Sequence, residues 1–522
     1  MVTCKNSPFS FQKPDDHLRL REIFINAGYS DSGVMGLLDG KAPSSIREND
    51  IPLLLRCTSG GSPLETLVRL FLMEVPVSFV NVSRAIATMN LDTWVSAGLL
   101  AVRGDDIIAR IKLLPFKGML VAFDQVRLLN TEEKEGYVMG IGASTLTLAN
   151  FTIRKPSLHV LDLGAGCGIQ AMLASTHSRH VTASDRNPRA VRFSRFNAAI
   201  NGLENMICME GDLFAPVAGN RFDLIVTNPP FVISPESRYI YRDSGLPTDQ
   251  ICQKIIREAS RYLTEGGFCQ MLCNWAEAEG QPWRDRLQEW VADLGCDAWV
   301  IRSESRDAAT YASTWIRHTE PGIGPEEFDD RFDQWMMYYK KQKIEAMSAG
   351  LITLRRSMSG RASWFRAEDG PEKTIGPCGD DILQGFALRD FLESVSDDAV
   401  LFDTRFQVSP DVRLNQELRP GNKGWQNESI RLERVKGLPY AGNIDPYVAA
   451  LLGRCDGTRP LGSFLKEMGD EFQEIDCTVL PEVAARVVRV LIERGFLIPK
   501  SLFRADTPVV DSLKSAVGGC GS

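Results

Sequence analysis

The most specific chemical pattern in the chain is an apolar run, Ile225-Val226-Thr227, followed at once by Asn228-Pro229-Pro230-Phe231. The two prolines fix the backbone and lack N–H donors. The side-chain amide of Asn228 and the carbonyl of Pro229 can accept both hydrogens of a planar NH2 group, and the ring of Phe231 can stack on it. The pattern predicts a catalytic site made of Asn228, Pro229 and Phe231. The alternative is a rigid strand exit.

A glycine-rich turn after an apolar strand is the second pattern: Val160-Leu-Asp162-Leu-Gly164-Ala-Gly166-Cys-Gly168. Glycines let the backbone turn tightly and approach a ligand before the next helix begins. Ile169 stands where a dinucleotide fingerprint requires its third glycine. S-adenosylmethionine, which has no phosphate, suits this turn better than a pyrophosphate does. The alternative is a purely structural glycine turn.

Two acidic residues follow at the ends of later strands. Asp185 closes the next strand, where a carboxylate can accept both ribose hydroxyl protons; alternatively it caps the helix after Pro188. Asp212 follows Gly211, where it could bind an adenine amino group or serve as a turn acid. With both acids in place, an amine held at Asn228 could attack a sulfonium methyl group without a strong base, because positioning and dipoles lower the barrier.

Together these motifs resemble a class I S-adenosylmethionine-dependent methyltransferase over roughly residues 120–300. The chain is similar to HemK/PrmC-type glutamine methyltransferases and to related enzymes that methylate amino groups of nucleic acids, which share the Asp/Asn-Pro-Pro-aromatic motif. The resemblance implies that Tyr137–Ala143 lines the methionine end of the cofactor. It also implies a cofactor site formed by Asp162, Gly164, Gly166, Gly168, Asp185, Asp212 and Asn228.

The loop after the Asn-Pro-Pro-Phe motif departs from the glutamine methyltransferases, which carry a Glu-Pro-containing stretch there. In this chain the loop runs from Ser237 to Asp249 and contains Tyr241, Arg242 and Asp243. We expect these three residues to bind the substrate and the loop to act as a lid. The alternative is a helix lead-in with Asp249 as the N-cap.

The resemblance implies methylation of a glutamine-type side-chain amide in a protein, for example a translation factor. The competing hypothesis is N-methylation of an adenine or guanine amino group in RNA or DNA. A third is a non-catalytic regulator that binds nucleic acid or a partner. The net charge of −8 favours a protein substrate. A basic run over residues 340–366 also contains Trp364 and Phe365. It could bind RNA phosphates or an acidic protein. The alternative is a solvated strand edge.

The elements that position these residues alternate between apolar strands and helix-length segments. Strands are expected at His159–Leu163, His180–Ser184, Phe222–Val226 and Gly267–Leu272. This alternation predicts an α/β fold with a doubly wound, mostly parallel, seven-stranded Rossmann-like sheet over residues 116–366.

The flanking segments have a different pattern. Residues 1–115 are predicted to form a helical, winged-helix-like domain that ends in a hairpin over Leu99–Leu113. Its presumed recognition helix carries little beyond Arg84 as a cation, so packing or dimerisation is favoured over nucleic-acid binding. Residues 380–522 are predicted to form an accessory domain. There Gly495-Phe-Leu-Ile498 echoes Gly98-Leu-Leu, which hints at a second winged-helix-like unit.

Composition excludes several classes. The 522 residues are 44% hydrophobic and 24% charged, which is typical of a globular protein with several domains. The twelve cysteines and five histidines show no zinc-ligand spacing, so no metal is expected. No secretory signal and no apolar run of ~18–20 residues are present. We therefore expect a cytoplasmic enzyme with reduced thiols and no membrane partner.

Overall fold

The computed structural model describes most of the chain. The described residues are 9, 11–46, 48–131, 134–236, 239–320, 322–357, 361–371, 373–395, 397–421, 424–471 and 480–502. The chain divides into two compact units, Met1–Gly370 and Pro371–Ser522. The predicted segments 1–115 and 116–366 both fall in the first unit.

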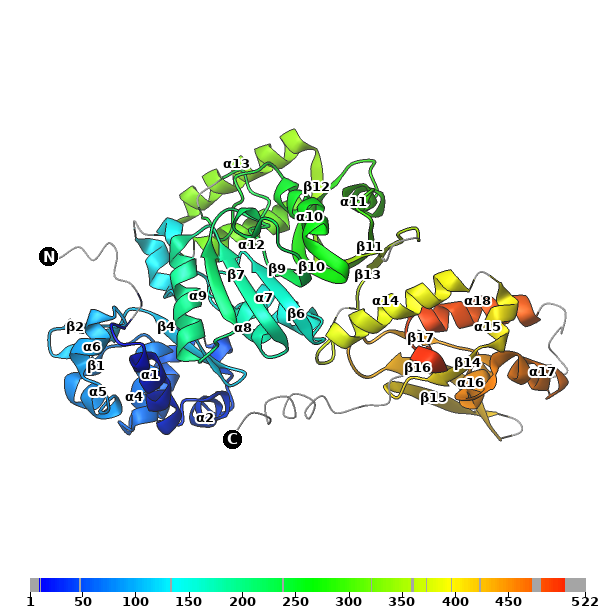
Figure 1. Cartoon of the computed structure of the whole chain (residues 1–522), viewed down its shortest axis with the longest axis horizontal. Coiled ribbons are helices and arrows are strands. Elements are labelled where there is room, and N and C mark those ends of the chain that lie inside the picture. Colours follow the sequence, from blue (N-terminus) through cyan, green and yellow to red (C-terminus); the bar gives the residue numbers. More distant parts are fainter. Residues whose placement is uncertain are drawn as a thin grey trace, which may run out of the picture. The chain divides into compact units, whose positions relative to one another are not determined.

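The centre of the first unit is one sheet (Figure 1). Its strands are β6 (Ser157–Leu163), β7 (Ser178–Asp185), β8 (Met206–Glu210), β9 (Phe222–Thr227), β10 (Leu263–Ala278), β11 (Cys296–Asp307), β12 (Ile344–Arg356) and β13 (Phe365–Asp369). Their order is β13-β11-β12-β10-β9-β6-β7-β8. The five strands from β8 to β10 are parallel, whereas β12 is antiparallel to both neighbours. The α/β prediction is confirmed, but the described sheet has eight strands rather than seven, because β13 adds an edge beside β11.

The order of the parallel strands creates a crevice at one place. From β6 the chain moves outward to β7 and β8, and then returns to the other side of β6 to form β9 and β10. The crossover helices are α8 (Ile169–Ser175), α9 (Pro188–Ile200) and α10 (Gln250–Tyr262). Ligands of doubly wound sheets bind at such a reversal, beyond the carboxyl ends of the strands. The ends of β6 and β9, at Leu163 and Thr227, are directly paired there.

The sheet and its helices share one hydrophobic core. On α10 the buried side chains recur at helical spacing (Cys252, Ile255, Ile256 and Ala259) and pack in the same cluster as Ile225 and Met271 of the sheet. This spacing keeps one face of α10 on the sheet. Helix α11 (Trp283–Val291) adds Leu287 and Trp290 to the cluster.

The N-terminal part of the first unit is mainly helical. Its elements are α1 (Asp15–Asn26), α2 (Asp31–Leu37), α3 (Ile51–Cys57), α4 (Pro63–Phe71), β1 (Val77–Ser78), α5 (Phe79–Ala85), α6 (Leu91–Ser96), β2 (Leu100–Arg103) and β3 (Asp106–Ala109). The three strands form an antiparallel sheet in the order β1-β3-β2. Ser62 and Glu65 start α4 with a reciprocal capping box. The hairpin predicted over Leu99–Leu113 is formed by β2 and β3 and ends at Ala109. The chain then continues into a second hairpin.

That second hairpin, β4 (Lys112–Phe116) and β5 (Met119–Phe123), is fixed to α9 by two amide side chains. Oδ1 and Nδ2 of Asn201 bind the backbone N–H and carbonyl of Leu120, at 2.9 and 2.7 Å. Asn197 binds the backbone of Ala122 in the same way, at 2.8 and 2.9 Å. Each amide pairs with β5 much as a neighbouring strand would, so the N-terminal part is anchored on the helix that follows β7.

A helical hairpin is inserted between β11 and β12. It consists of α12 (Ala308–Thr319) and α13 (Pro325–Gln342). Its interior is formed by Tyr311, Ile316, Trp335 and Tyr339, which pack with Val232 and Ile233. The hairpin therefore covers the segment that follows the Asn-Pro-Pro-Phe motif.

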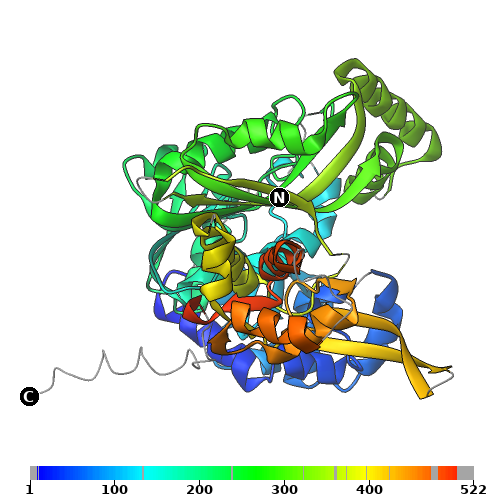
Figure 2. The same cartoon turned by 90° about the vertical axis from the view of Figure 1, so that its right-hand side faces the viewer.

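The second unit combines short helices with two small antiparallel sheets. Its elements are α14 (Gly379–Ser394), α15 (Asp398–Asp403), β14 (Arg405–Val408), β15 (Val412–Gly421), β16 (Gly424–Arg434), β17 (Ala441–Asn443), α16 (Pro446–Arg454), β18 (Asp456–Pro460), α17 (Leu461–Glu471), α18 (Leu480–Glu493) and β19 (Leu497–Pro499). The sheet orders are β18-β14-β19 and β15-β16-β17. Phe406, Phe464 and Ile492 lie in its core. Strands β15 and β16 form a long ribbon that extends away from the helices of this unit (Figure 2).

Two features are absent from the described residues. None of their helices combines the length and the apolar character that a membrane span needs. In the same residues, no three or more His, Cys, Asp or Glu side chains are grouped so as to hold a metal ion.

Candidate active site

A cavity of about 170 Å³ lies beyond the carboxyl ends of β6, β7 and β9. Its wall includes the glycine turn, both acids that follow later strands, and the asparagine of the Asn-Pro-Pro-Phe motif. Of the predicted cofactor residues, it contains Asp162, Gly164, Gly166, Asp185, Asp212 and Asn228. Gly168 is outside the wall. The sheet therefore brings together residues that are up to 66 positions apart because their strands are neighbours.

The glycine turn presents bare backbone to this cavity. Gly164 and Gly166 have φ of 71° and 56°, which favours glycine, and no described atom lies within 4 Å of a Cβ built at either one. Gly168 also has positive φ, at 82°, but its Cβ would lie 2.8 Å from Oγ of Ser194. The first two glycines thus leave room for a ligand, whereas Gly168 allows α8 and α9 to pack closely.

Asp185 ties the glycine turn to the end of β7. Its Oδ2 accepts from the Gly166 N–H and its Oδ1 from the Asn187 N–H, both at 2.8 Å. The cap of α9 is Asn187, which accepts from the Arg189 N–H, so the N-cap alternative for Asp185 does not apply. A carboxylate has about four acceptor positions, so both oxygens can still accept ribose hydroxyls.

Asp162 lies deeper, at the end of β6. Its Oδ2 accepts from the Ala171 N–H of α8 at 2.9 Å, and the residue is only 2% exposed. Burial raises the pKa of this carboxyl to about 7. Asp162 therefore holds α8 to the sheet directly behind the glycine turn.

The amide of Asn228 is oriented by a residue that sequence reasoning did not single out. Its Nδ2 donates to Oγ of Ser144, at the start of α7 (Ala143–Phe151), across 3.2 Å. Its Oδ1 is buried and has no hydrogen-bond partner among the described residues. Pro229 and Pro230 also line the cavity. The cavity wall thus holds a carbonyl-type acceptor without a donor, which a ligand N–H would satisfy.

Phe231 occupies a different place from the one predicted. It is not part of the cavity wall, and its ring lies edge-on to Trp315 with 6.5 Å between the ring centres. It packs between the sheet core and the α12–α13 hairpin. Phe231 therefore packs against the hairpin in this structure, and the stacking role predicted for its ring stays a prediction.

The segment Tyr137–Gly140 forms another wall of the cavity. It is held by Asp124, whose Oδ2 accepts from the Val138 N–H at 2.9 Å. Arg189 clamps the same carboxylate through Nε and Nη2, at 2.8 and 2.5 Å. Asp124 is 1% exposed, so the pair is a buried ion pair that fixes this wall to the start of α9.

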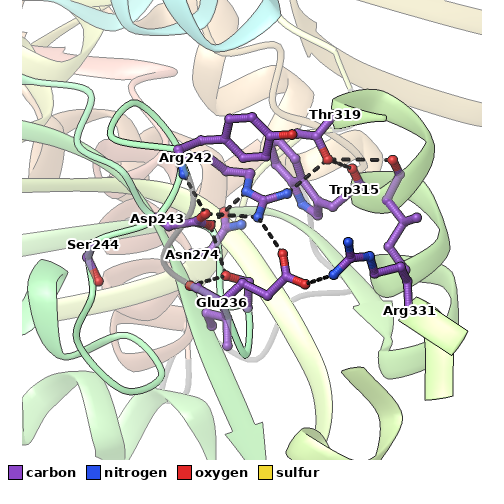
Figure 3. A network of polar contacts seen from close by, with 12 residues as sticks. Glu236, Arg242, Asp243, Ser244, Asn274, Trp315, Thr319 and Arg331 are labelled. Carbon is purple, nitrogen blue, oxygen red and sulfur yellow. Dashed lines mark hydrogen bonds and ion pairs between the residues drawn. The ribbon is translucent and has the colours of Figure 1, made fainter. Parts of the chain in front are cut away.

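The predicted substrate residues separate into two groups. Tyr241 lines the cavity, and its ring lies 5.4 Å from that of Tyr137; burial raises the pKa of both phenols. Arg242 and Asp243 lie outside the wall and are each 2% exposed, because they bind each other and the surrounding polar groups (Figure 3). Asp249 does not cap α10 with its side chain; it accepts from the Ala276 N–H and from Arg286 instead.

The arginines of the basic run over residues 340–366 are bound within the fold, whereas its three lysines, Lys340, Lys341 and Lys343, are exposed. Arg355 and Arg361 both bind Asp297, which is fully buried. Arg356 donates to the carbonyls of Ser260 and Leu294, and Arg366 pairs with Glu368. These arginines connect the sheet edge to its surroundings, so they are not a free surface for phosphate groups.

Comparison with known proteins locates the same region. A model described as the methyltransferase small domain matches residues 141–289. Two models described as domains of unknown function match residues 26–110 and 384–499.

Three curated relatives each match part of this chain. A ribosomal protein uL3 glutamine methyltransferase of Bradyrhizobium diazoefficiens is 36% identical over 121 residues, which are 21% of this chain and 38% of that protein. A ribosomal RNA small subunit methyltransferase C of Alcanivorax borkumensis is 36% identical over 115 residues, or 22% and 32%. A release factor glutamine methyltransferase of Xylella fastidiosa is 31% identical over 166 residues, or 29% and 58%.

The chain thus spans between about a third and three fifths of the length of these relatives. The matched region contains the glycine turn, Asp185, Asp212 and the Asn-Pro-Pro-Phe motif, and it forms most of the cavity at the switch point of the sheet. Residues 141–289 are therefore a class I S-adenosylmethionine-dependent methyltransferase domain of the HemK/PrmC type.

Proposed function

We propose that this protein is an N-methyltransferase that transfers the methyl group of S-adenosylmethionine to a planar NH2 group. The observation that carries this proposal is the buried, unpartnered Oδ1 of Asn228 in the wall of a cavity that also contains Asp185 and the bare backbone of Gly164 and Gly166. One part of the cavity suits a nucleoside, and the other suits a nitrogen that carries two hydrogens.

Bound S-adenosylmethionine supplies an electrophilic methyl group on a sulfonium sulfur. Asp185 would accept the ribose hydroxyls, and the backbone at Gly164 and Gly166 would lie along the amino-acid part. Oδ1 of Asn228 and the carbonyl of Pro229 would each accept one hydrogen of the acceptor nitrogen and so fix its lone pair in line with the methyl group. The nitrogen loses its proton after it has become cationic, so the protein contributes orientation and fixed dipoles rather than a strong base.

One observation favours a protein as the methylated polymer. The exposed face of α13 carries five acidic residues in its first turns: Glu326, Glu327, Asp329, Asp330 and Asp333. The relatives include both glutamine methyltransferases and ribosomal RNA methyltransferases by name, so they do not distinguish the polymers. Helix α13 packs on the loop that leads from the motif back to the cavity. A polyanion beside it would be repelled, whereas a basic protein segment would be attracted.

The second candidate is an exocyclic amino group of adenine or guanine in RNA or DNA. The specific observation in its favour is the equally similar relative named a ribosomal RNA methyltransferase. A nucleobase amine is also planar and conjugated, so Asn228 and Pro229 would hold it in the same way. The two candidates differ in the polymer and not in the chemistry.

For the N-terminal part we propose a winged-helix-like packing module. The order α4, β1, α5, α6, β2, β3 with sheet order β1-β3-β2 supports this assignment. Helix α6, in the place of a recognition helix, contains Asp92 and no Lys or Arg, which favours packing over nucleic-acid recognition. The bonds from Asn197 and Asn201 to β5 provide the contact to the methyltransferase domain.

The test is transfer of a tritiated methyl group from S-adenosylmethionine to a lysate of a strain that lacks the gene. The labelled sample is divided and treated with protease or with nuclease. Label lost only on protease treatment supports the glutamine-type acceptor, and label lost only on nuclease treatment supports the nucleobase. No label above that of Asn228→Ala would refute the enzyme and favour a non-catalytic regulator.

A further inference from the structure

The loop that returns from the Asn-Pro-Pro-Phe motif to the cavity begins at Phe231 and ends at Ser244; we call residues 231–244 the acceptor loop. Its described residues are 231–236 and 239–244. Ile240, Tyr241 and Ser244 line the cavity at its far end. The loop therefore fixes the direction in which the chain leaves the Asn-Pro-Pro-Phe motif, and it also forms part of the cavity wall.

The first part of the acceptor loop is held by two buried tyrosines. The Ile233 N–H donates to the hydroxyl of Tyr311 on α12 at 3.2 Å, and the Ile233 carbonyl accepts from the hydroxyl of Tyr339 on α13 at 2.8 Å. Nδ2 of Asn274 on β10 also donates to the Tyr311 hydroxyl, at 2.7 Å. Ile233 is fully buried and lies outside any helix or strand. Its backbone N–H and carbonyl are thus both hydrogen-bonded by side chains of the helical hairpin.

The far part of the acceptor loop is held by a buried charge network (Figure 3). Nε and Nη2 of Arg242 bind the two carboxylate oxygens of Asp243, at 2.7 and 2.9 Å. Nη1 of Arg242 donates to Oγ1 of Thr319 at the end of α12, at 2.9 Å. Glu236 lies 3.7 Å from Arg242 and accepts from Arg331 of α13 at 2.6 Å. Every one of these contacts joins the loop to itself or to the hairpin.

Opening this loop would cost free energy, because it would separate buried charges from their partners. Arg242 and Asp243 have side chains that are only 1% exposed, and removing the partner of a buried charge costs several kcal/mol. The guanidinium also lies 4.8 Å from the ring of Tyr239 and 5.8 Å from that of Trp335. In its described residues the acceptor loop is thus a fixed part of the cavity wall, whereas the sequence predicts a lid over residues 237–249.

We propose that the α12–α13 hairpin is the support that sets the acceptor side of the cavity, and that Tyr311 and Tyr339 are positioning residues acting through Ile233. Ile233 follows Phe231 by two residues, so fixing its peptide group fixes the exit of the Asn-Pro-Pro-Phe corner. The effect on catalysis rests on the proposed methyl transfer, whereas the effect on the loop does not.

The variants Tyr311→Phe and Tyr339→Phe each remove one hydroxyl and keep the packed ring. Tyr29→Phe is the matched control, because the Tyr29 hydroxyl is also buried and donates to a backbone carbonyl, that of Leu113, at 2.6 Å. It lies in the N-terminal part and outside the cavity wall. Arg242 is left unchanged, since its removal would leave Asp243 buried without its partner.

The first readout is hydrogen exchange of the full-length protein, followed on peptides that cover residues 231–236. In the wild type we expect protection comparable to that of β10, and in both tyrosine variants about tenfold faster exchange confined to the acceptor loop. The control should exchange normally there. A wild-type loop that exchanges as fast as an exposed turn, or a variant loop with unchanged exchange, would overturn the proposal.

The second readout is transfer of the tritiated methyl group to the lysate fraction that the wild type labels. We expect kcat to fall about tenfold or more in both variants, with the KM for S-adenosylmethionine and the Kd for S-adenosylhomocysteine unchanged. Full kcat in Tyr339→Phe would refute the positioning role. If the wild type itself labels nothing, the proposed methyl transfer fails, and the exchange experiment still decides whether the hairpin fixes the loop.

Discussion

Asn228 and Ser144 are 84 positions apart, yet Nδ2 of the asparagine donates to the serine Oγ across 3.2 Å, and this bond leaves Oδ1 as the buried acceptor of the site. An amide can face either way, and only the orientation with Nδ2 on Ser144 presents an oxygen to a substrate N–H. The first turn of α7 therefore holds the amide of Asn228 in this orientation.

Ser144→Ala should lower kcat by about tenfold, because Asn228 then loses the acceptor that fixes its amide orientation. Asn228→Ala should lower kcat by about 100-fold or more, since the acceptor itself is removed. Calorimetry with S-adenosylhomocysteine should show affinities within about threefold of the wild type for both variants. Asn220→Ala, at an exposed turn, is the control. Full activity of Asn228→Ala would contradict the role of the amide.

Asp185→Ala should weaken S-adenosylhomocysteine binding by about 100-fold, the loss expected for two hydrogen bonds to a charged acceptor. Asp223→Ala is the matched control, because this carboxylate also accepts two backbone N–H groups, those of Leu158 and His159, but at the amino end of the sheet. The control should lose stability and keep its affinity. Equal affinity losses in the two variants would contradict a direct contact between Asp185 and the ligand.

The stability of the first unit should depend on pH through Asp162. Burial raises the pKa of its carboxyl from 3.8 to about 7. Between these pH values the carboxyl is protonated in the folded state and ionised in the unfolded state. The contribution of this group to the free energy of unfolding is therefore highest below pH 4 and falls as the pH rises to 7. Asp162→Asn cannot ionise, so the difference between variant and wild type should increase from pH 5 to pH 8 in urea titrations. A constant difference would show that Asp162 titrates normally.

Arg189→Met should destabilise the protein by about 3 kcal/mol, because it leaves Asp124 buried without its cation. The Tyr137–Gly140 wall is bound to the same carboxylate, so S-adenosylhomocysteine affinity should fall as well. Asp124→Asn keeps an acceptor for the Val138 N–H and removes the charge, so its loss of affinity should be smaller. Thermal unfolding and calorimetry measure the two effects. Unchanged affinity in Arg189→Met would separate the ion pair from the cofactor site.

Most of the residues that the sequence located correctly in the cavity lie at the ends of parallel strands. Gly164 and Asn228 come directly after an apolar strand and Asp185 ends one, and parallel strands bring their carboxyl ends to one edge. Local sequence is therefore enough to group them. The same logic explains why β6, β7 and β9 match their predicted ranges closely.

The residues that the sequence did not locate depend on contacts across the fold. Arg242 and Asp243 are adjacent charges in a loop, which is the usual pattern of an exposed turn; only the cover provided by residues 308–342 buries them. Asp124 and Arg189 are 65 positions apart and carry no local signal of pairing. Strand β13 begins at the end of the basic run, and its partner β11 lies more than 60 positions before it.

The measurement that tests the central claim most directly is a crystal structure of the protein with S-adenosylhomocysteine bound. We predict the ribose hydroxyls on Asp185, the amino-acid part along Gly164 and Gly166, and the sulfur facing the amide of Asn228. A ligand bound elsewhere, or a sulfur turned away from Asn228, would contradict the proposed site of methyl transfer.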